Sequence, residues 1–182
     1  MQRLLPPSAD KMSPEQRAVA DEIQRTRGGL SGPLGVWIHN PEMARLIAPV
    51  GGFLRSEGKL PGRLRELAIL VTARFWKAEY EWYSHHKQAA SEGLPQAAID
   101  TIHQGKRPTL DGADAVVFEV ATSLHERHEI PDALYRQAVD TLGINQVVEL
   151  VALLGYYTLV SMGLNAFRVG LPPGEPRQFG ND

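Results

Sequence analysis

Apolar residues recur at helical spacing along most of the chain. After Pro61-Gly62 they fall three or four positions apart, at Leu64, Leu67, Ala68, Val71 and Phe75. This spacing places them on one face of an amphipathic helix. No stretch alternates strictly between apolar and polar residues, as a half-buried strand does. The pattern therefore predicts an all-α fold.

Capping and turn residues divide the pattern into about eight helices. Ser13-Pro14-Glu15-Gln16 is a capping box with proline at the first helical position. Glycines and Pro33 predict a loop after the first helix, and Asn145 is the expected N-cap of the last. The expected helices begin near Pro14, Pro41, Gly62, Glu79, Pro95, Gly112, Asp132 and Asn145, and the last ends near Val169.

The last helix is the most apolar part of the chain. It has no charged residue from Leu150 to Phe167, but Gly155, Ser161 and other polar or small residues interrupt it. A membrane span needs about 20 mostly apolar residues. The interruptions favour a buried core helix or a subunit-interface helix. We therefore expect no membrane association.

Composition narrows the classes of function. The 182 residues fit a single domain, and a net charge of −2 gives no reason to expect nucleic acid as a partner. The N-terminal ten residues contain no apolar signal segment, so we expect a cytoplasmic protein. The chain has no cysteine. This excludes disulfides, cysteine-bound metal clusters and thiol nucleophiles.

The polar segment from Glu79 to His86 is the best candidate for chemistry. Glu81 and His85 are four residues apart and share one face of a helix. A carboxylate there can orient an imidazole and raise its basicity, which is a general acid/base unit. The alternative is an exposed pair without function. His85 and His86 point about 100° apart, so we predict no metal site.

Four further residues are candidates for substrate contact. Trp82 and Tyr83 either line a pocket or pack in the core. Tyr157, on the last helix, needs a hydrogen-bond partner if it is buried. Arg74 follows Glu66 by eight residues on nearly the same helix face, where it either attracts a substrate carboxylate or is an ordinary surface arginine.

Several of these segments occur in the order found in one family. They are Leu60 to Val71, Ala78 to Trp82, His85, Gly93-Leu94, Val147 to Val151 and Gly155-Tyr156-Tyr157. In this order the sequence resembles the carboxymuconolactone decarboxylase and AhpD-like superfamily. The resemblance implies a single AhpD-like helical domain over residues 33–173, preceded by an N-terminal helix and loop (1–32) and followed by an extended tail (174–182). It also implies a homo-oligomer, a trimer or a hexamer.

The chain departs from the thiol motif of the AhpD-like branch. That motif is a Glu, then Cys-x-x-Cys beginning twelve residues later, then a His four residues after the second Cys. Glu66 and His85 match the outer positions, whereas Ala78 and Glu81 replace the two cysteines. Dithiol peroxidase chemistry needs a thiolate. We therefore expect no thiol-dependent peroxidase activity.

Three hypotheses follow for the function. The first is an acid/base enzyme without a cofactor, a decarboxylase or an isomerase/lyase, whose substrate is a small organic acid or lactone. His85 would be its acid/base, Glu81 or Glu66 would orient His85, and a short turn after Phe75 would bring Glu66 close. The second is an oligomeric ligand-binding or scaffold protein without catalysis. The third, metal-assisted chemistry at Glu81 and His85, has the least support.

Overall fold

The structure is a computed structural model that describes residues 2–180. All its regular elements are helices, which confirms the predicted fold class. Met1 and residues 181–182, the ends of the predicted N-terminal segment and tail, lie outside the described residues. The elements within them are η1 (Ala9–Lys11), α1 (Pro14–Arg27), α2 (Pro33–Trp37), α3 (Pro41–Ser56), α4 (Gly62–Phe75), α5 (Glu79–Ser91), α6 (Gln96–His103), α7 (Gly112–Arg127), α8 (Asp132–Leu142) and α9 (Ile144–Ala166).

Most helix ends follow the signals in the sequence. The Ser13 hydroxyl accepts a hydrogen bond from the backbone N–H of Gln16, and the Gln16 side chain accepts one from the backbone N–H of Ser13. This is the predicted capping box, and it satisfies two of the donors that a helix start leaves free. At the other end of α1, Gly28 takes the left-handed conformation with φ of 79°. That conformation suits glycine and ends the helix.

Two local predictions are wrong. The stretch expected as a loop contains the short helix α2, whose side chains Leu34, Val36 and Trp37 are buried. Five residues are too few to show helical periodicity, and packing against the rest of the fold holds them in place. The last helix begins at Ile144 with Gly143 as its N-cap and ends at Ala166. Asn145 is therefore not a cap.

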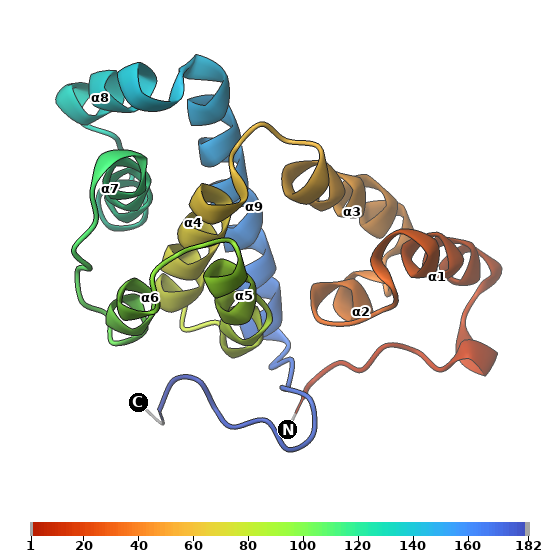
Figure 1. Cartoon of the computed structure of the whole chain (residues 1–182). Helices are drawn as coiled ribbons and strands as arrows, with labels where there is room; N and C mark the ends of the chain where they lie inside the picture. The colour runs from red at the N-terminus through yellow and green to blue at the C-terminus, as the bar shows by residue number, and fades with distance from the viewer. Residues whose placement is uncertain (1, 181–182) are drawn as a thin grey trace.

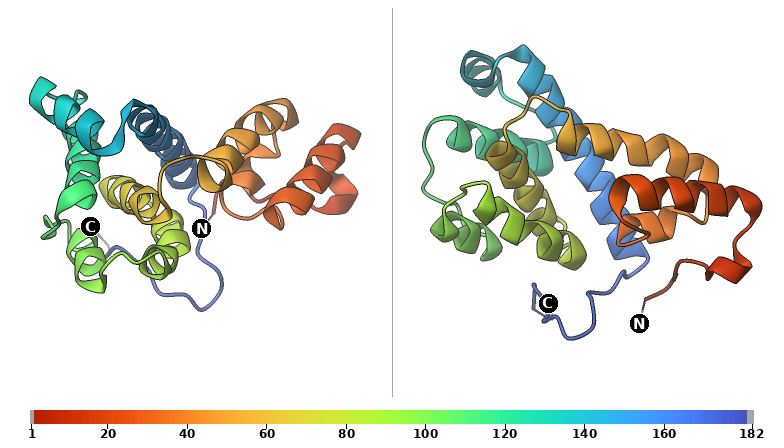
Figure 2. Two further views of the ribbon diagram at one scale, coloured as in Figure 1. Left: turned by 45° about the horizontal axis from the view of Figure 1, so that its top comes forward. Right: turned by 45° about the vertical axis from the view of Figure 1, so that its right-hand side comes forward.

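Helix α9 runs through the middle of the fold, between two groups of helices. Figures 1 and 2 show α4 to α8 on one side of α9 and α1 to α3 on the other. Each group has its own hydrophobic cluster, and α9 contributes to both. Leu150 and Leu153 pack in the cluster of α4 to α8, whereas Val160 and Leu164 pack in the cluster of α1 to α3. The fold therefore has a seam along α9.

Helices α4 and α5 form a hairpin next to this seam. Almost every residue of α4 from Leu64 to Ala73 is buried, because α5, α7 and α9 all pack on it. A turn of three residues joins α4 to α5, and Lys77 within it has φ of 48°. The turn reverses the chain, so residues of α4 face residues of α5.

The outer face of α9 is open to solvent. Val148, Val151, Leu159 and Met162 are exposed. Within residues 2–180, α9 alone is long and apolar enough to cross a membrane. It packs against α2, α3, α4, α5 and α8, as the core helix of a globular protein does.

The described part of the C-terminal tail has no helix and lies against α5 and α6. The carboxylate of Glu79, the first residue of α5, accepts hydrogen bonds from the backbone N–H groups of Gln178 and Phe179. The Phe179 ring is buried between Trp82 and His103. The tail is therefore anchored near its end.

Candidate functional site

The α4–α5 hairpin brings one imidazole between two carboxylates. His85 Nδ1 lies 2.6 Å from Glu66 Oε2, and His85 Nε2 lies 3.0 Å from Glu81 Oε1. All three residues are buried, with at most 4% of their surface exposed. The turn after Phe75 thus places Glu66 beside His85, an approach that the sequence allowed but did not determine. We call these three residues the Glu–His–Glu chain.

Glu66 is held from both sides. Its Oε2 contacts His85, and its Oε1 lies 3.3 Å from Arg65 Nε. Arg65 also reaches the carboxylate of Glu92, at the end of α5. With both oxygens engaged and no solvent contact, Glu66 can fix the orientation of His85. It is too enclosed to touch a substrate itself.

The two carboxylates change the charge of His85. Burial alone would lower the pKa of His85, but the charges of Glu81 and Glu66 and their hydrogen bonds outweigh it and raise the pKa to about 9. At neutral pH His85 is therefore an imidazolium that donates both N–H groups, one to each carboxylate. The contact between His85 and Glu81 lies on the side of the Glu–His–Glu chain that faces the seam.

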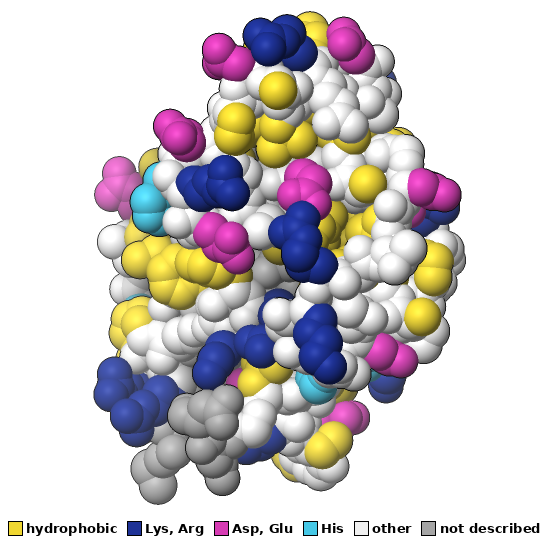
Figure 3. Space-filling model, turned by 90° about the vertical axis from the view of Figure 1, so that its left-hand side faces the viewer, with side chains coloured by type: hydrophobic (Ala, Val, Ile, Leu, Met, Phe, Trp, Pro, Cys, Tyr) yellow, Lys and Arg dark blue, Asp and Glu magenta, His cyan; other side chains and the backbone are white. Residues whose placement is uncertain are grey.

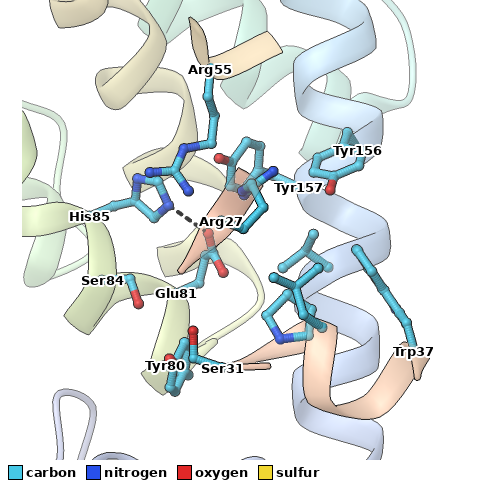
Figure 4. Close-up of a pocket in the computed structure, with 13 residues that line it drawn as sticks. Arg27, Ser31, Trp37, Arg55, Tyr80, Glu81, Ser84, His85, Tyr156 and Tyr157 are labelled. Carbon is cyan, nitrogen blue, oxygen red and sulfur yellow. Dashed lines mark ion pairs between the residues drawn. The ribbon is translucent and has the colours of Figure 1, made fainter. Parts of the chain in front are cut away.

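A cavity of about 120 Å³ opens at the seam beside this chain. Its walls come from both groups of helices: Tyr80, Glu81, Ser84 and His85 from α5, Tyr156, Tyr157 and Val160 from α9, and Arg27, Ser31, Pro33, Leu34, Trp37 and Arg55 from the segment α1 to α3. Figure 4 shows one oxygen of Glu81 turned to His85 and the other turned away from it. Glu81 is thus placed between the imidazole and the cavity.

Two arginines line the same cavity as Glu81. Arg27 ends α1 and Arg55 lies in the last turn of α3. The Nη1 atom of Arg27 is buried and has no hydrogen-bond partner among the described residues. A buried donor of a charged group without a partner is costly. The arrangement is therefore suited to an anion, which would supply the missing acceptor.

Two tyrosines of α9 line the same cavity. The Tyr157 ring meets the His85 ring edge to face at a centroid distance of 5.3 Å. Burial, and then the charge of Glu81, raise the pKa of Tyr157 well above its usual value, and burial raises the pKa of Tyr156 to about 12. Both phenols therefore keep their protons and can act as hydrogen-bond donors.

The structure places only some of the predicted site residues at this cavity. Glu81, His85 and Tyr157 line the cavity, and Glu66 lies directly behind His85. Trp82 is buried on the other side of α5, where its ring packs on His103 and Phe179. Tyr83 donates a hydrogen bond to Glu175 of the tail. Arg74 lies over the Phe179 ring, at the far end of α4.

Sequence reasoning missed the arginines and the walls built by α2. Arg27 and Arg55 are near helix C-termini, where basic residues are common for reasons unrelated to function. Nothing in the local sequence links either residue to His85. Tyr156 is next to a predicted residue, and its signal was the Tyr-Tyr pair on the apolar helix.

No group of three or more His, Asp or Glu side chains in the part of the chain that the structure describes has an arrangement able to hold a metal ion. Glu66 and Glu81 contact His85 instead.

Comparison with known proteins supports the fold. Residues 41–122 match the model of the carboxymuconolactone decarboxylase family. This range includes α3 to α6 and most of α7, and with them the whole Glu–His–Glu chain. No curated protein matches the sequence significantly.

Solved structures match almost the whole chain. An uncharacterized peroxidase-related protein from Silicibacter sp. TM1040 is 16% identical, with a TM-score of 0.75 over 93% of this chain and 91% of that one. An AhpD-core, peroxidase-related protein from Ralstonia eutropha JMP134 is 14% identical, with a TM-score of 0.76 over 94% and 93%. The debrominase Bmp8, with a cysteine replaced by alanine and 2,3,4-tribromopyrrole bound, is 13% identical, with a TM-score of 0.70 over 93% and 91%. At these identities the likeness shows a shared fold.

Proposed function

We propose that this cysteine-free chain, whose residues 41–122 match the carboxymuconolactone decarboxylase family model and which shares the fold of AhpD-like proteins, is a cofactor-independent acid/base enzyme acting on a small carboxylated or lactone-like metabolite. The reaction is a decarboxylation or an isomerisation/lyase step. One observation carries the proposal: a buried imidazolium joins two carboxylates beside a cavity that also contains two arginines. Buried titratable groups with perturbed pKa values in a cavity are typical of catalytic sites.

The geometry favours a division of roles within the Glu–His–Glu chain. Both nitrogens of His85 are occupied, so a proton reaches a ligand through Glu81, the carboxylate nearest to the open space. Glu81 exchanges the proton with a substrate carbon or oxygen, and His85 returns it. Glu66 is a positioning residue, because it fixes the imidazole without facing the cavity. Acid/base catalysis of this kind accelerates a step by about 10²–10⁴-fold.

The arginines favour a carboxylate on the substrate. Arg27 offers a buried donor without a partner, and Arg55 lies beside it in the same wall. Arginine binds carboxylates through paired, charge-assisted hydrogen bonds. Among the residues predicted to contact substrate, the proposal uses Tyr157, which lines this cavity, and gives no role there to Trp82, Tyr83 or Arg74.

The size and chemistry of the cavity restrict the substrate further. A cavity of about 120 Å³ accommodates the reacting part of a small molecule. The bound 2,3,4-tribromopyrrole of the debrominase supports a small planar ring as a ligand of this fold. With no cofactor, the electron pair left by departing carbon dioxide, or by a removed proton, must be accepted by the substrate itself. A conjugated carbonyl or a lactone provides such an acceptor.

The proposal is tested by screening small unsaturated carboxylic acids and carboxylated lactones. Carbon dioxide release and deuterium incorporation from D₂O, followed by NMR, report decarboxylation and proton exchange separately. For any substrate found, we expect His85→Gln and Glu81→Gln to reduce turnover by about 10²–10⁴-fold. His86→Gln is the matched control, because His86 is the adjacent residue, bonds the Trp82 carbonyl and does not line the cavity. Unchanged turnover in both Gln variants would refute the proposal.

The complete burial of Glu66 favours one other function. The Glu–His–Glu chain also ties α4 to α5, as it would in a scaffold or ligand-binding protein without catalysis. In that case His85→Gln would lower the melting temperature, and no compound in the screen would be turned over.

A further inference from the structure

A second cavity lies at the far end of α4. Its volume is about 450 Å³, within the range of small-molecule sites. The end of α4, the end of α6 with the loop after it, and the second half of α7 line it. It shares no residue with the cavity beside His85. Figure 3 shows the face that carries α6, α7 and α8, where Lys and Arg side chains gather beside apolar ones.

Three cationic side chains line this second cavity: Arg74, Lys106 and Arg107. Glu126 is the one acidic residue among the described residues of its lining, and Glu119, just outside the lining, forms an ion pair with Arg107, so the cationic side chains still outnumber the acidic ones. Arg74 is the most enclosed of the three. Its Nε atom is buried without a hydrogen-bond partner in the described chain, and its Nη2 end passes close to Gly105. Gly105 has φ of 72°, and a side chain there would collide with the guanidinium.

Aromatic rings form the apolar part of the lining. The Phe75 ring stacks on the His125 ring with centroids 4.8 Å apart and planes 15° apart, yet Phe75 is 48% exposed. Phe118 is buried beneath the Arg107 guanidinium, which lies 5.4 Å from its ring centroid. The Arg74 guanidinium lies 5.3 Å from the ring centroid of Phe179. An exposed aromatic ring beside arginine and lysine side chains is a surface on which a second planar group can pack.

Hydrogen bonding defines the state of His125. The Thr72 hydroxyl donates to the Ala68 carbonyl at 2.9 Å, so it can only accept from His125 Nε2, also at 2.9 Å. Nε2 therefore carries a proton. Burial lowers the pKa of His125 to about 4, so the ring is neutral at physiological pH and its Nδ1 is an acceptor. The ring adds a flat, uncharged surface to the lining.

We propose that this cavity is a second binding site, for a planar organic anion. The ring of the ligand packs on Phe75 and its carboxylate meets Arg74, Lys106 and Arg107, which supplies an acceptor for the buried Arg74 nitrogen. This site is separate from the proposed reaction, because its lining shares no residue with the first cavity or with the Glu–His–Glu chain. It accounts for the half-buried Arg74, whose buried Nε atom has no role at the first cavity.

Benzoate is a suitable probe, with benzamide as its neutral analogue and acetate as the anion without a ring. In a titration of the ¹⁵N-labelled full chain, benzoate should shift the backbone amide signals of Gly105, Thr122 and His125. Arg74→Gln and Arg107→Gln should each weaken this binding by about tenfold, as expected for the loss of a charge-assisted hydrogen bond. Arg107 is exposed, so its variant keeps the site testable if Arg74→Gln disturbs folding.

Two controls separate the possible sites. Arg136→Gln removes an exposed arginine of α8 and should leave benzoate binding unchanged. Arg55→Gln should affect only shifts at Ser84, His85 and Tyr157, around the first cavity. Absence of shifts near Gly105, equal affinity for benzamide or acetate, or unchanged binding in both Arg74→Gln and Arg107→Gln would overturn the proposal.

Discussion

Glu66 Oε2 and His85 Nδ1 are 2.6 Å apart, and neither residue has appreciable contact with solvent. This contact joins α4 to α5 and leaves the second nitrogen of His85 for Glu81. An ionic contact without water around it responds strongly to the charge of either partner. Removing the proton of His85 at high pH, or replacing one of the two residues, therefore tests what this contact contributes.

Stability should fall at alkaline pH. The pKa of His85 is about 9 in the folded chain and 6.5 in the reference state. Below pH 6.5 both states hold the proton and the stabilisation is complete; it is lost as the pH rises through 9. The full effect is about 3 kcal/mol in the free energy of unfolding. Urea unfolding at a series of pH values measures it, and His85→Gln should remove this part of the slope.

Glu66→Gln should lower the pKa of His85. The variant keeps the shape of the side chain and removes one of the two negative charges that raise that pKa. NMR titration of the His85 ring measures the shift, and the pH profile of any activity should move in the same direction. Glu92→Gln is the control, since Glu92 contacts Arg65 but not His85. A purely structural Glu66 would leave the pH profile in place.

Gly51→Ala should disturb the cavity, whereas Gly52→Ala should not. A methyl group at Gly51 would overlap the Tyr156 hydroxyl, and that ring is held by Trp37 and Tyr157. Overpacking of this kind costs about 1–3 kcal/mol. At Gly52 the nearest neighbour would be 4.0 Å away, so alanine there should be neutral or stabilising by about 0.5–1 kcal/mol. Thermal unfolding of both variants gives the comparison; equal melting temperatures would contradict it.

His125 should titrate near pH 4 and destabilise the fold in acid. Burial lowers its pKa from 6.5 to about 4, so the folded state favours the neutral ring. The resulting stabilisation is present above pH 6.5 and is lost as the pH falls toward 4. NMR titration of the ring checks the pKa. His128, an exposed residue of the same region, provides an internal comparison.

We expect the chain to form a homo-oligomer, a trimer or a hexamer, through the outer face of α9. Val148, Val151, Leu159 and Met162 are exposed on this helix, with exposed fractions of 39% to 62%. Contiguous apolar surface of this kind marks association sites. Light scattering should give a multiple of 20.1 kDa. Met162→Glu should reduce the mass, and Gln137→Glu, on exposed α8, should not. A monomeric wild-type chain would contradict the expectation.

Local sequence patterns predicted the features that residues close together in the sequence determine. The spacing of Glu81 and His85 predicted their shared helix face, whereas the short turn after Phe75 only allowed the approach of Glu66, which the packing of α4 on α5 determines. Arg27 and Arg55 could not be found in this way, because they reach the cavity beside His85 only through the packing of α1 on α3 and of α3 on α9. For the same reason α2 was missed: its five residues carry no period of their own, and the burial of Trp37 stabilises it.

The seam along α9 separates two groups of residues that line the first cavity. Under the proposed function, the residues that would hold and pass a proton belong to the α4–α5 hairpin, while the cations that would select a ligand come from the ends of α1 and α3. Apart from Leu54 at the end of α3, which packs with the hairpin, each group of helices has its own cluster of apolar side chains. Substitutions in the first three helices would therefore change which acid is accepted while the hairpin stays intact, and ligand preference and reaction chemistry could be engineered separately.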